Sequence, residues 1–189
     1  EIPLRLVGSE MCIRDSYYNA FLMLSNGLEA KVGTLGSKYE FFHEWKRLKE
    51  SDAGSVELKT MLRGICEKKT FLDLLENFIL YDHSGGRTTK ILARNHQYLG
   101  VNEAVSAYEN RKLKDGRLGV FWHTQGSGKS YSMIFLAQKI RRKFAGSPTI
   151  VVLTDRDELN RQISDTFENC GLLGKTKASQ FIASSGTDL

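Results

Sequence analysis

Cysteine, proline and long hydrophobic runs are scarce in this sequence, and each scarcity excludes a class of protein. The 189 residues include only two prolines and three cysteines. Cys12, Cys66 and Cys170 lie far apart with no Cys-x-x-Cys pair, so neither a disulfide framework nor a zinc site is expected. No window approaches the roughly eighteen consecutive apolar residues of a membrane span, and the start lacks the pattern of a secretory signal. We therefore expect a cytoplasmic protein with no membrane partner.

The composition is that of a globular chain with an apolar core. Hydrophobic residues make up 41% and charged residues 26%, which argues against disorder. The net charge of +5 permits a polyanionic partner without demanding one. The four histidines show no ligand spacing, so we expect no metal site beyond nucleotide-bound Mg²⁺.

The most informative stretch is 118–130, LGVFWHTQGSGKS. Its apolar start, Leu118 to Trp122, predicts a buried strand, and the glycine-rich remainder predicts a phosphate-binding loop that opens a helix. Glycine lacks a Cβ, so the backbone can wrap an anion and aim its N–H groups inward. Lys129 would reach the β and γ phosphates of ATP, and the Ser130 hydroxyl would ligate Mg²⁺. The predicted nucleotide-binding residues of the loop are Gln125, Gly126, Ser127, Gly128, Lys129 and Ser130.

One position departs from the full motif G-x-x-x-x-G-K-[ST], since the chain has His123 where the motif has glycine. A flexible surface loop is the alternative interpretation, because Gly, Ser and Lys are common in such loops. The flanks favour the phosphate loop. Residues 149–154 (TIVVLT) predict a second buried strand, so the region reads as a βαβ unit of an α/β fold. The expected buried face of the intervening helix is Met133, Leu136, Ala137, Ile140 and Phe144.

The first half of the chain predicts a hairpin followed by helices. Two apolar segments, 20–25 and 28–35, flank Asn26-Gly27, a strong hairpin signal. Helical spacing predicts helices over 38–49, 56–66 and 70–81, with Phe41, Phe42, Trp45 and Leu48 as the core face of the first, and Phe71, Leu74, Leu75, Phe78 and Ile79 as the stripe of the last. Turn formers over 82–87 predict a linker, which divides the chain into domains 17–85 and 86–189.

The second half adds a short strand and two helices. We expect a strand over 88–93 and a helix over 94–112 with Tyr98, Val101, Val105 and Tyr108 on one side. Asp155 followed by Glu158 predicts a helix start, and Leu159, Ile163 and Phe167 lie four apart on its expected buried face.

Residues 1–16 do not follow the pattern of the rest. EMCIRDS, residues 10–16, resembles the translation of a transposase adaptor used in sequencing libraries. We therefore expect this segment to be an adaptor scar outside the native fold, with an ordinary N-terminal strand and loop as the alternative.

Five motifs together resemble the restriction subunit of type I restriction-modification enzymes, over residues 17–189. They are LSNGLEAKVGTL (24–35), FFHEWK (41–46), ARNHQYLGVNEAV (93–105), VFWHTQGSGKSYSM (120–133) and VVLTDRDELNRQI (151–163). The pairing of WHTQGSGKS with TDRDELNRQI is specific, whereas GSGKS alone would indicate only an NTPase. His123 agrees with this family's own pattern.

The resemblance implies a PD-(D/E)xK nuclease domain followed by two RecA-like motor domains of helicase superfamily two. Such a subunit uses ATP and Mg²⁺ to translocate double-stranded DNA and cleaves it away from the recognition site, in a complex with methyltransferase and specificity subunits. Residues 17–85 would then be the α/β C-terminal part of the nuclease domain. Residues 86–189 would be the first part of a P-loop, RecA-like motor domain.

The resemblance also implies roles for single residues. Gln97 lies where such helicases place a glutamine that reads adenine. Thr154, Arg156 and Gln162 lie in the helicase motif whose residues contact the DNA backbone. The basic cluster 141–143 competes for the DNA role, although it also suits a helix C-terminus. The chain lacks a nuclease D…ExK constellation, since Glu57-x-Lys59 sits in a helical pattern, and it lacks the motor's DE-x-H motif. We therefore expect these 189 residues to be catalytically silent.

Two other functions stay open. One is a superfamily-two helicase or translocase without a nuclease, against which the hairpin and the block around Trp45 argue. The other is a truncated, inert nucleotide-binding module. Reading the genomic frame past both ends discriminates the three: D…ExK upstream with DE-x-H downstream indicates the restriction subunit, DE-x-H alone the translocase, and neither motif the inert module.

Overall fold

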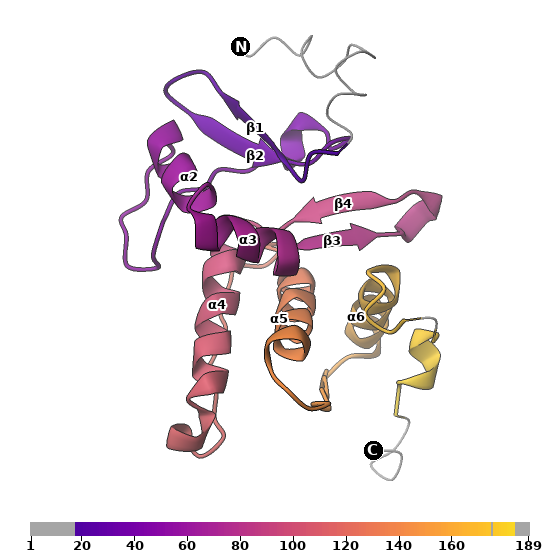
Figure 1. Cartoon of the computed structure of the whole chain (residues 1–189). Coiled ribbons are helices and arrows are strands. Elements are labelled where there is room, and N and C mark those ends of the chain that lie inside the picture. The colour runs from indigo at the N-terminus through magenta and orange to yellow at the C-terminus, as the bar shows by residue number, and fades with distance from the viewer. Residues whose placement is uncertain (1–17, 175, 184–189) are drawn as a thin grey trace.

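The computed structural model describes residues 18–174 and 176–183, so the predicted adaptor segment 1–16 lies outside the described residues. The described chain is mixed α/β, with two short hairpins and five helices in the order shown in Figure 1. The elements are β1 (Leu22–Ser25), β2 (Ala30–Gly33), α2 (Leu58–Ile65), α3 (Lys68–Asn77), β3 (Ile79–Asp82), β4 (Thr89–Leu92), α4 (Asn95–Glu109), α5 (Lys129–Lys143) and α6 (Asp157–Asn169). Short 3₁₀ helices lie at Tyr39–Phe41, Ser84–Gly86, Arg111–Lys114 and Ala178–Gln180.

The predicted first hairpin is confirmed. β1 and β2 pair antiparallel, from Leu22 opposite Gly33 to Ser25 opposite Ala30. At the turn the Asn26 Oδ1 accepts hydrogen bonds from the N–H groups of Leu28 (3.0 Å) and Glu29 (2.7 Å). This side chain replaces missing backbone partners, so the Asn-Gly signal acts through local chemistry.

The predicted helix over 38–49 is wrong. After the 3₁₀ helix Tyr39–Phe41 the chain extends, and His43 pairs with Val32 through N···O distances of 2.8 and 2.9 Å. The edge of β2 supplies backbone partners that a helix would not use, so tertiary pairing overrides the helical spacing. Of the expected core face, Phe42 and Trp45 are nevertheless buried, whereas Phe41 and Leu48 are exposed.

The predicted helix over 70–81 ends early and the predicted linker is part of a hairpin. α3 stops at Asn77, and β3 pairs antiparallel with β4, from Ile79 opposite Leu92 to Asp82 opposite Thr89. Burial alternates along β3, as expected for a strand with one covered face. Residues 82–87 therefore connect two paired strands, whereas the domain boundary at 85/86 stays a prediction.

One apolar core runs through both halves of the described chain. The Trp45 ring lies 5.3 Å from that of Tyr98, which lies 4.8 Å from Phe78, and Phe78 lies 5.5 Å from Phe135. These aromatic contacts join the extended segment, α3, α4 and α5 across the predicted boundary.

α4, α5 and α6 stand side by side below the hairpins (Figure 1). The predicted helix over 94–112 is confirmed as α4, with Val101 and Val105 buried. In α5 the buried face is Ser132, Ile134, Phe135, Ala137, Lys139 and Ile140. Ala137 and Ile140 match the expected face, but Met133 is exposed, so the prediction of that residue is wrong.

α6 begins one residue later than a capping box of Asp155 and Glu158 predicts. Its N-cap is Arg156 with no side-chain cap, so Asp155 does not form a capping box. Ile163 and Phe167 are buried as expected, whereas Leu159 is exposed.

The two predicted motor strands do not form. Residues 118–122 and 149–154 have no ladder partner in the described part of the chain, and Val120 is 95% and Leu153 85% exposed. A strand exists only with a hydrogen-bonded neighbour, which the apolar pattern alone cannot supply. Residues 149–154 instead line a cavity of about 920 Å³ against α6, with both polar and apolar walls.

Two features are absent from the described residues. Within 18–174 and 176–183, no helix is long and apolar enough to cross a membrane. The same residues contain no group of three or more His, Cys, Asp or Glu side chains arranged to hold a metal ion.

The imidazole of His43 predicts a pH dependence of folding. Burial lowers its pKa to about 4 from an ordinary value of 6.5, and the nearby Arg94 acts in the same direction. Because the folded pKa is depressed, His43 stays neutral in the fold while the unfolded chain takes up a proton. Its contribution is present above about pH 6.5 and is lost as the pH falls towards 4, by up to about 3 kcal/mol. Urea unfolding at pH 7.5 and pH 5 should show this loss.

His43→Gln is the control for that measurement, because it removes the titrating group and keeps a polar side chain. We expect the variant to lose less stability than the wild type between the two pH values. An equal loss would assign the pH dependence to the other histidines.

Candidate functional site

The loop before α5 has the backbone shape of an anion cradle. Gly126 and Gly128 have φ values of +76° and +85°, in the left-handed region that favours glycine. Gly128 is the N-cap of α5, which begins at Lys129, so unpaired N–H groups and the positive end of the helix dipole meet at the loop. A Cβ at Gly126 would meet nothing within 4 Å, so this side of the loop is open.

The predicted phosphate and Mg²⁺ ligands lie together around this cradle. Lys129 is exposed, and its ammonium donates to the Thr124 carbonyl at 3.2 Å, above the loop. Ser130 follows directly in the first turn of α5. The Ser127 Oγ is buried and has no hydrogen-bond partner in the structure. An unpaired buried hydroxyl beside open N–H groups fits a phosphate oxygen, which would satisfy it.

Gln97 holds the loop from the outside. Its Nε2 donates to the Gly128 carbonyl at 2.9 Å, and its Oε1 accepts from the Arg94 N–H at 2.8 Å. The side chain is buried, with 3% of the residue exposed. The structure therefore brings Gln97 to the phosphate loop. Both the Nε2 and the Oε1 of its amide are hydrogen-bonded to backbone groups.

Two histidines that sequence reasoning did not assign a role also support the loop. His96 Nε2 lies 3.1 Å from the Ser127 carbonyl, and the rings of His96 and His123 meet edge to face at 4.7 Å. Burial lowers the pKa of His123, with the nearby His96 and Lys129 acting in the same direction. His123 is therefore neutral at pH 7. The only available signal for His96 was its place beside Gln97 in the sequence.

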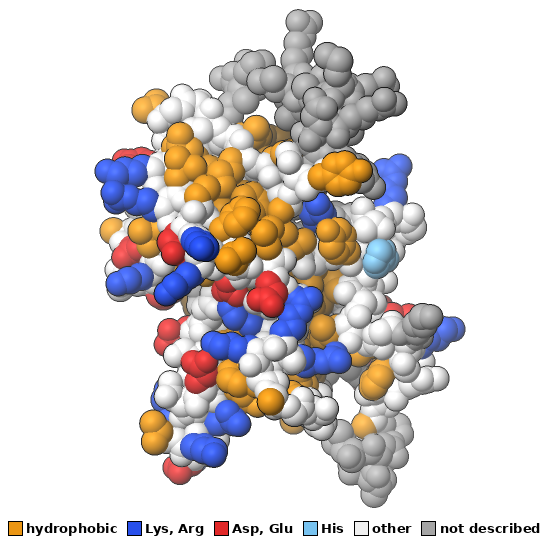
Figure 2. Space-filling view, viewed as in Figure 1, with side chains coloured by type: hydrophobic (Ala, Val, Ile, Leu, Met, Phe, Trp, Pro, Cys, Tyr) orange, Lys and Arg blue, Asp and Glu red, His pale blue; other side chains and the backbone are white. Residues whose placement is uncertain are grey.

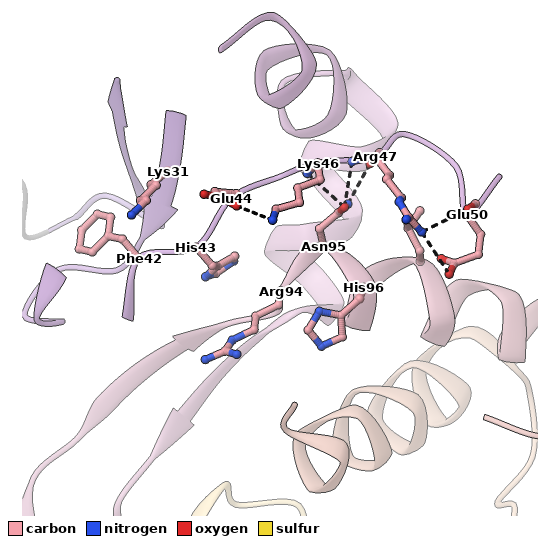
Figure 3. Close-up of a pocket in the computed structure, with 11 residues that line it drawn as sticks. Lys31, Phe42, His43, Glu44, Lys46, Arg47, Glu50, Arg94, Asn95 and His96 are labelled. Carbon is pink, nitrogen blue, oxygen red and sulfur yellow. Dashed lines mark hydrogen bonds and ion pairs between the residues drawn. The ribbon is translucent and has the colours of Figure 1, made fainter. Parts of the chain in front are cut away.

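A charged cavity of about 490 Å³ is lined in part by His96, the residue that contacts the Ser127 carbonyl (Figure 3). It lies between the extended segment 42–50 and the start of α4. Asn95 joins the two walls, since its Oδ1 accepts from the N–H groups of Lys46 and Arg47 and its Nδ2 donates to the Arg47 carbonyl. Lys46 pairs with Glu44 at 2.7 Å, while Arg94 has no acidic partner among the residues drawn. The cavity therefore suits an anionic or polar group.

The first turn of α5 is tied to the second hairpin. The Tyr131 hydroxyl donates to Asp82 Oδ2 at 2.8 Å, next to Ser130. Burial and the Asp82 carboxylate raise the pKa of Tyr131 above its usual range. Burial opposes ionisation of Asp82, but hydrogen bonds from Ser84 and Tyr131 hold its pKa below the ordinary value. Burial also raises the pKa of the Cys170 thiol to about 12, which makes this cysteine unreactive.

The predicted DNA-binding residues lie away from the loop, before and within α6. Arg156 is 79% exposed and makes a loose 3.7 Å pair with Asp155. Gln162 is exposed and Thr154 is half-buried. In the competing basic cluster, Arg141 donates to the Leu172 carbonyl and Lys143 pairs with Glu109 at 2.6 Å. Arg156 therefore makes looser contacts with other protein groups than Arg141 and Lys143 do, which leaves its guanidinium more available for DNA phosphates.

Comparison with known proteins indicates what this site is similar to. The family model for SWI2/SNF2 ATPases matches residues 96–189. The endonuclease subunit of the type I restriction enzyme HindI from Haemophilus influenzae is 40% identical over 161 residues, which is 80% of this chain and 15% of that protein. A relative from Methanocaldococcus jannaschii, named for the type I restriction enzyme MjaIXP, is 31% identical over 177 residues, or 80% of this chain and 16% of its own. The chain thus spans about one sixth of these relatives.

Proposed function

Because the chain is related to the endonuclease subunits of type I restriction enzymes and carries a SWI2/SNF2 ATPase region, we propose that it is part of an ATP-dependent restriction subunit. That subunit binds ATP, translocates double-stranded DNA and cleaves it away from the recognition site. The carrying observation is the glycine cradle that opens α5, with Lys129 and Ser130 in its first turn.

The loop residues fit the triphosphate of ATP. The N–H groups of residues 126 and 128–130 and the unpaired Ser127 hydroxyl would bind phosphate oxygens, and Lys129 would neutralise their charge. The Ser130 hydroxyl would hold Mg²⁺, which shields the β and γ phosphates when bound. Gln125 is the first residue of the loop and is exposed.

The two halves have different proposed origins. Residues 17–85 would be the C-terminal part of the nuclease domain and residues 86–189 the first part of a RecA-like motor domain. Glu57 is the N-cap of α2 and Lys59 lies in its first turn, which supports a helix start rather than a nuclease ExK motif. Without the nuclease carboxylates and the DE-x-H motif, these residues would bind nucleotide and perform no hydrolysis. Methyltransferase and specificity subunits are the proposed partners, in the cytoplasm.

A titration with ATP and GTP tests both the nucleotide site and the role of Gln97. We propose that Gln97 reads adenine by exchanging its two backbone contacts for N6 and N7 of the base, a pair of atoms that a glutamine amide can bind. Gln97→Ala removes the support of the Gly128 carbonyl for both nucleotides, so ATP binding should weaken roughly tenfold more than GTP binding.

The matched control is Gln162→Ala, which removes an exposed amide far from the loop. An equal loss for ATP and GTP would restrict Gln97 to holding the Gly128 carbonyl. A wild-type chain that binds neither nucleotide would contradict the proposed site.

The DNA track is tested through Arg156 in the complete subunit. We propose that Thr154, Arg156 and Gln162 contact DNA phosphates, because hydroxyl, guanidinium and amide groups donate to phosphate oxygens. Arg156→Ala should lower DNA-stimulated ATP hydrolysis severalfold and leave ATP affinity without DNA unchanged. If the loss appears only when 141–143 are replaced, the DNA follows α5 instead.

A further inference from the structure

A buried lysine lies on the same helix as the phosphate-loop residues. The Lys139 Nζ contacts both carboxylate oxygens of Asp73, at 2.5 and 2.6 Å, and the Asn102 Oδ1 at 2.5 Å. It also lies 4.9 Å from the centre of the Phe78 ring. Only 6% of the residue is exposed. All three donor positions of the ammonium therefore have a polar partner.

The charged groups of this cluster favour one position of α5 relative to α3. Burial lowers the pKa of Lys139, while the Asp73 carboxylate raises it again. A buried ammonium is tolerated only with its partners in place, and removing one partner of a buried pair is strongly destabilising. A small slide of α5 along α3 would separate the charges, whereas apolar contacts would tolerate it.

The cluster joins helices with different predicted roles. Asp73 lies on α3, in the predicted nuclease part, while Asn102 and Lys139 lie on α4 and α5. Figure 2 shows acidic and basic side chains mixed in a band beneath the apolar upper surface. At the other end of α5, Tyr131 binds Asp82 of β3. The two ties are about 12 Å apart along the helix axis. α5 is therefore held near both ends by residues that precede position 85.

We propose that Lys139, Asp73 and Asn102 form a junction that fixes α5 to α3, and so sets the position of Lys129 and Ser130 relative to bound ATP. Lys139 is then a positioning residue of the nucleotide site, an assignment that rests on the proposed function. Through this junction, a displacement of α3 in the predicted nuclease part moves the phosphate loop. Conversely, ATP binding at the loop shifts the position of α3. The rigid backbone of α5 carries the displacement between them.

The test compares Lys139→Met with the double variant Asp73→Leu/Lys139→Met in the 189-residue chain. The single variant leaves the Asp73 carboxylate without a cation and should lose stability in urea. The double variant should recover most of that stability, because well-packed apolar side chains can replace a buried ion pair. The double variant does not restore the wild-type position of α5 relative to α3. Hydrogen exchange of the amides of 132–135, which are bonded to the carbonyls of residues 128–131 at the start of α5, should therefore remain roughly tenfold faster than in the wild type in both variants.

Lys143→Met is the matched control. It removes a lysine one turn further along α5 whose ion pair with Glu109 is about half exposed, so exchange in 132–135 should not change. Wild-type exchange in the double variant would overturn the junction and leave the cluster a purely local support. If the stronger variants fail to fold, Asn102→Ala removes the contacts of one amide with Lys139 and Asp73 and leaves the ion pair in place. It should accelerate exchange at 132–135 in the same direction; no acceleration overturns the junction.

A titration with ATP separates this inference from the proposed function. The double variant should bind ATP severalfold more weakly than the wild type, in step with its faster exchange. If the wild type binds no ATP, the proposed function fails, while the exchange measurement still decides whether α3 positions the loop.

Discussion

Lys129→Ala is expected to weaken ATP binding by roughly tenfold or more. The ammonium is held above the phosphate loop by the Thr124 carbonyl, at the positive end of α5, and would meet the β and γ phosphates there. A charge-assisted hydrogen bond of this kind contributes about 1.5 to 3 kcal/mol. Titration calorimetry with MgATP on the 189-residue chain, or on a chain extended at its C-terminus, measures the difference.

Arg142→Ala is the matched control for that experiment. Arg142 is an exposed cation on the same helix, away from the loop, so its loss changes the net charge equally. We expect its ATP affinity to stay within about twofold of the wild type. Equal affinities of the wild type and Lys129→Ala would show that the loop does not place this lysine on the triphosphate.

Gly128→Ala is expected to lower both the stability of the chain and its ATP affinity. Gly128 has φ +85°, and a Cβ there would lie 2.8 Å from the Nε2 of Gln97. The left-handed conformation alone costs about 1 to 2 kcal/mol for alanine. Displacing Gln97 would also break the hydrogen bond to the Gly128 carbonyl, for a total of about 2 to 3 kcal/mol. Urea unfolding and an ATP titration report the two effects.

Gly126→Ala measures the cost of the left-handed backbone alone, without a clash with Gln97. Its φ of +76° is similar, but a Cβ there would meet nothing within 4 Å. We expect a loss of about 1 to 2 kcal/mol from conformation alone. Equal losses in the two variants would mean that Gln97 does not hold the loop.

Local signals in the sequence were sufficient where one residue's chemistry decides the backbone. Asn26 closes its own turn, and the glycines of 126–128 open α5 as expected. Lys129 and Ser130 could therefore be proposed from their spacing as ligands of phosphate and of Mg²⁺, roles that stay predictions. The relationship to restriction endonuclease subunits was likewise available from the motifs, because it depends on residue identity alone.

Signals that need a partner elsewhere in the chain were misleading. Residues 38–49 have helical spacing, but β2 offers His43 a strand partner. Residues 78–82 continue the stripe of α3, yet β4 pairs with them. The apolar segments 118–122 and 149–154 look like buried strands and have no neighbour in the described chain. Ladder hydrogen bonds join distant residues, so no local pattern contains them.

By itself, the sequence determined the glycine loop before α5, the first hairpin turn and the positions of α2, α4, α5 and α6 to within a few residues, since these depend on φ and on spacing between near neighbours. Only the tertiary structure decided that Gln97 holds the Gly128 carbonyl and that Lys139 is buried against Asp73. A lysine in an amphipathic helix is expected in water, because burying its charge alone is costly. That cost is offset only when a carboxylate from another helix lies within hydrogen-bond reach, and the packing of α3, α4 and α5 brings it there.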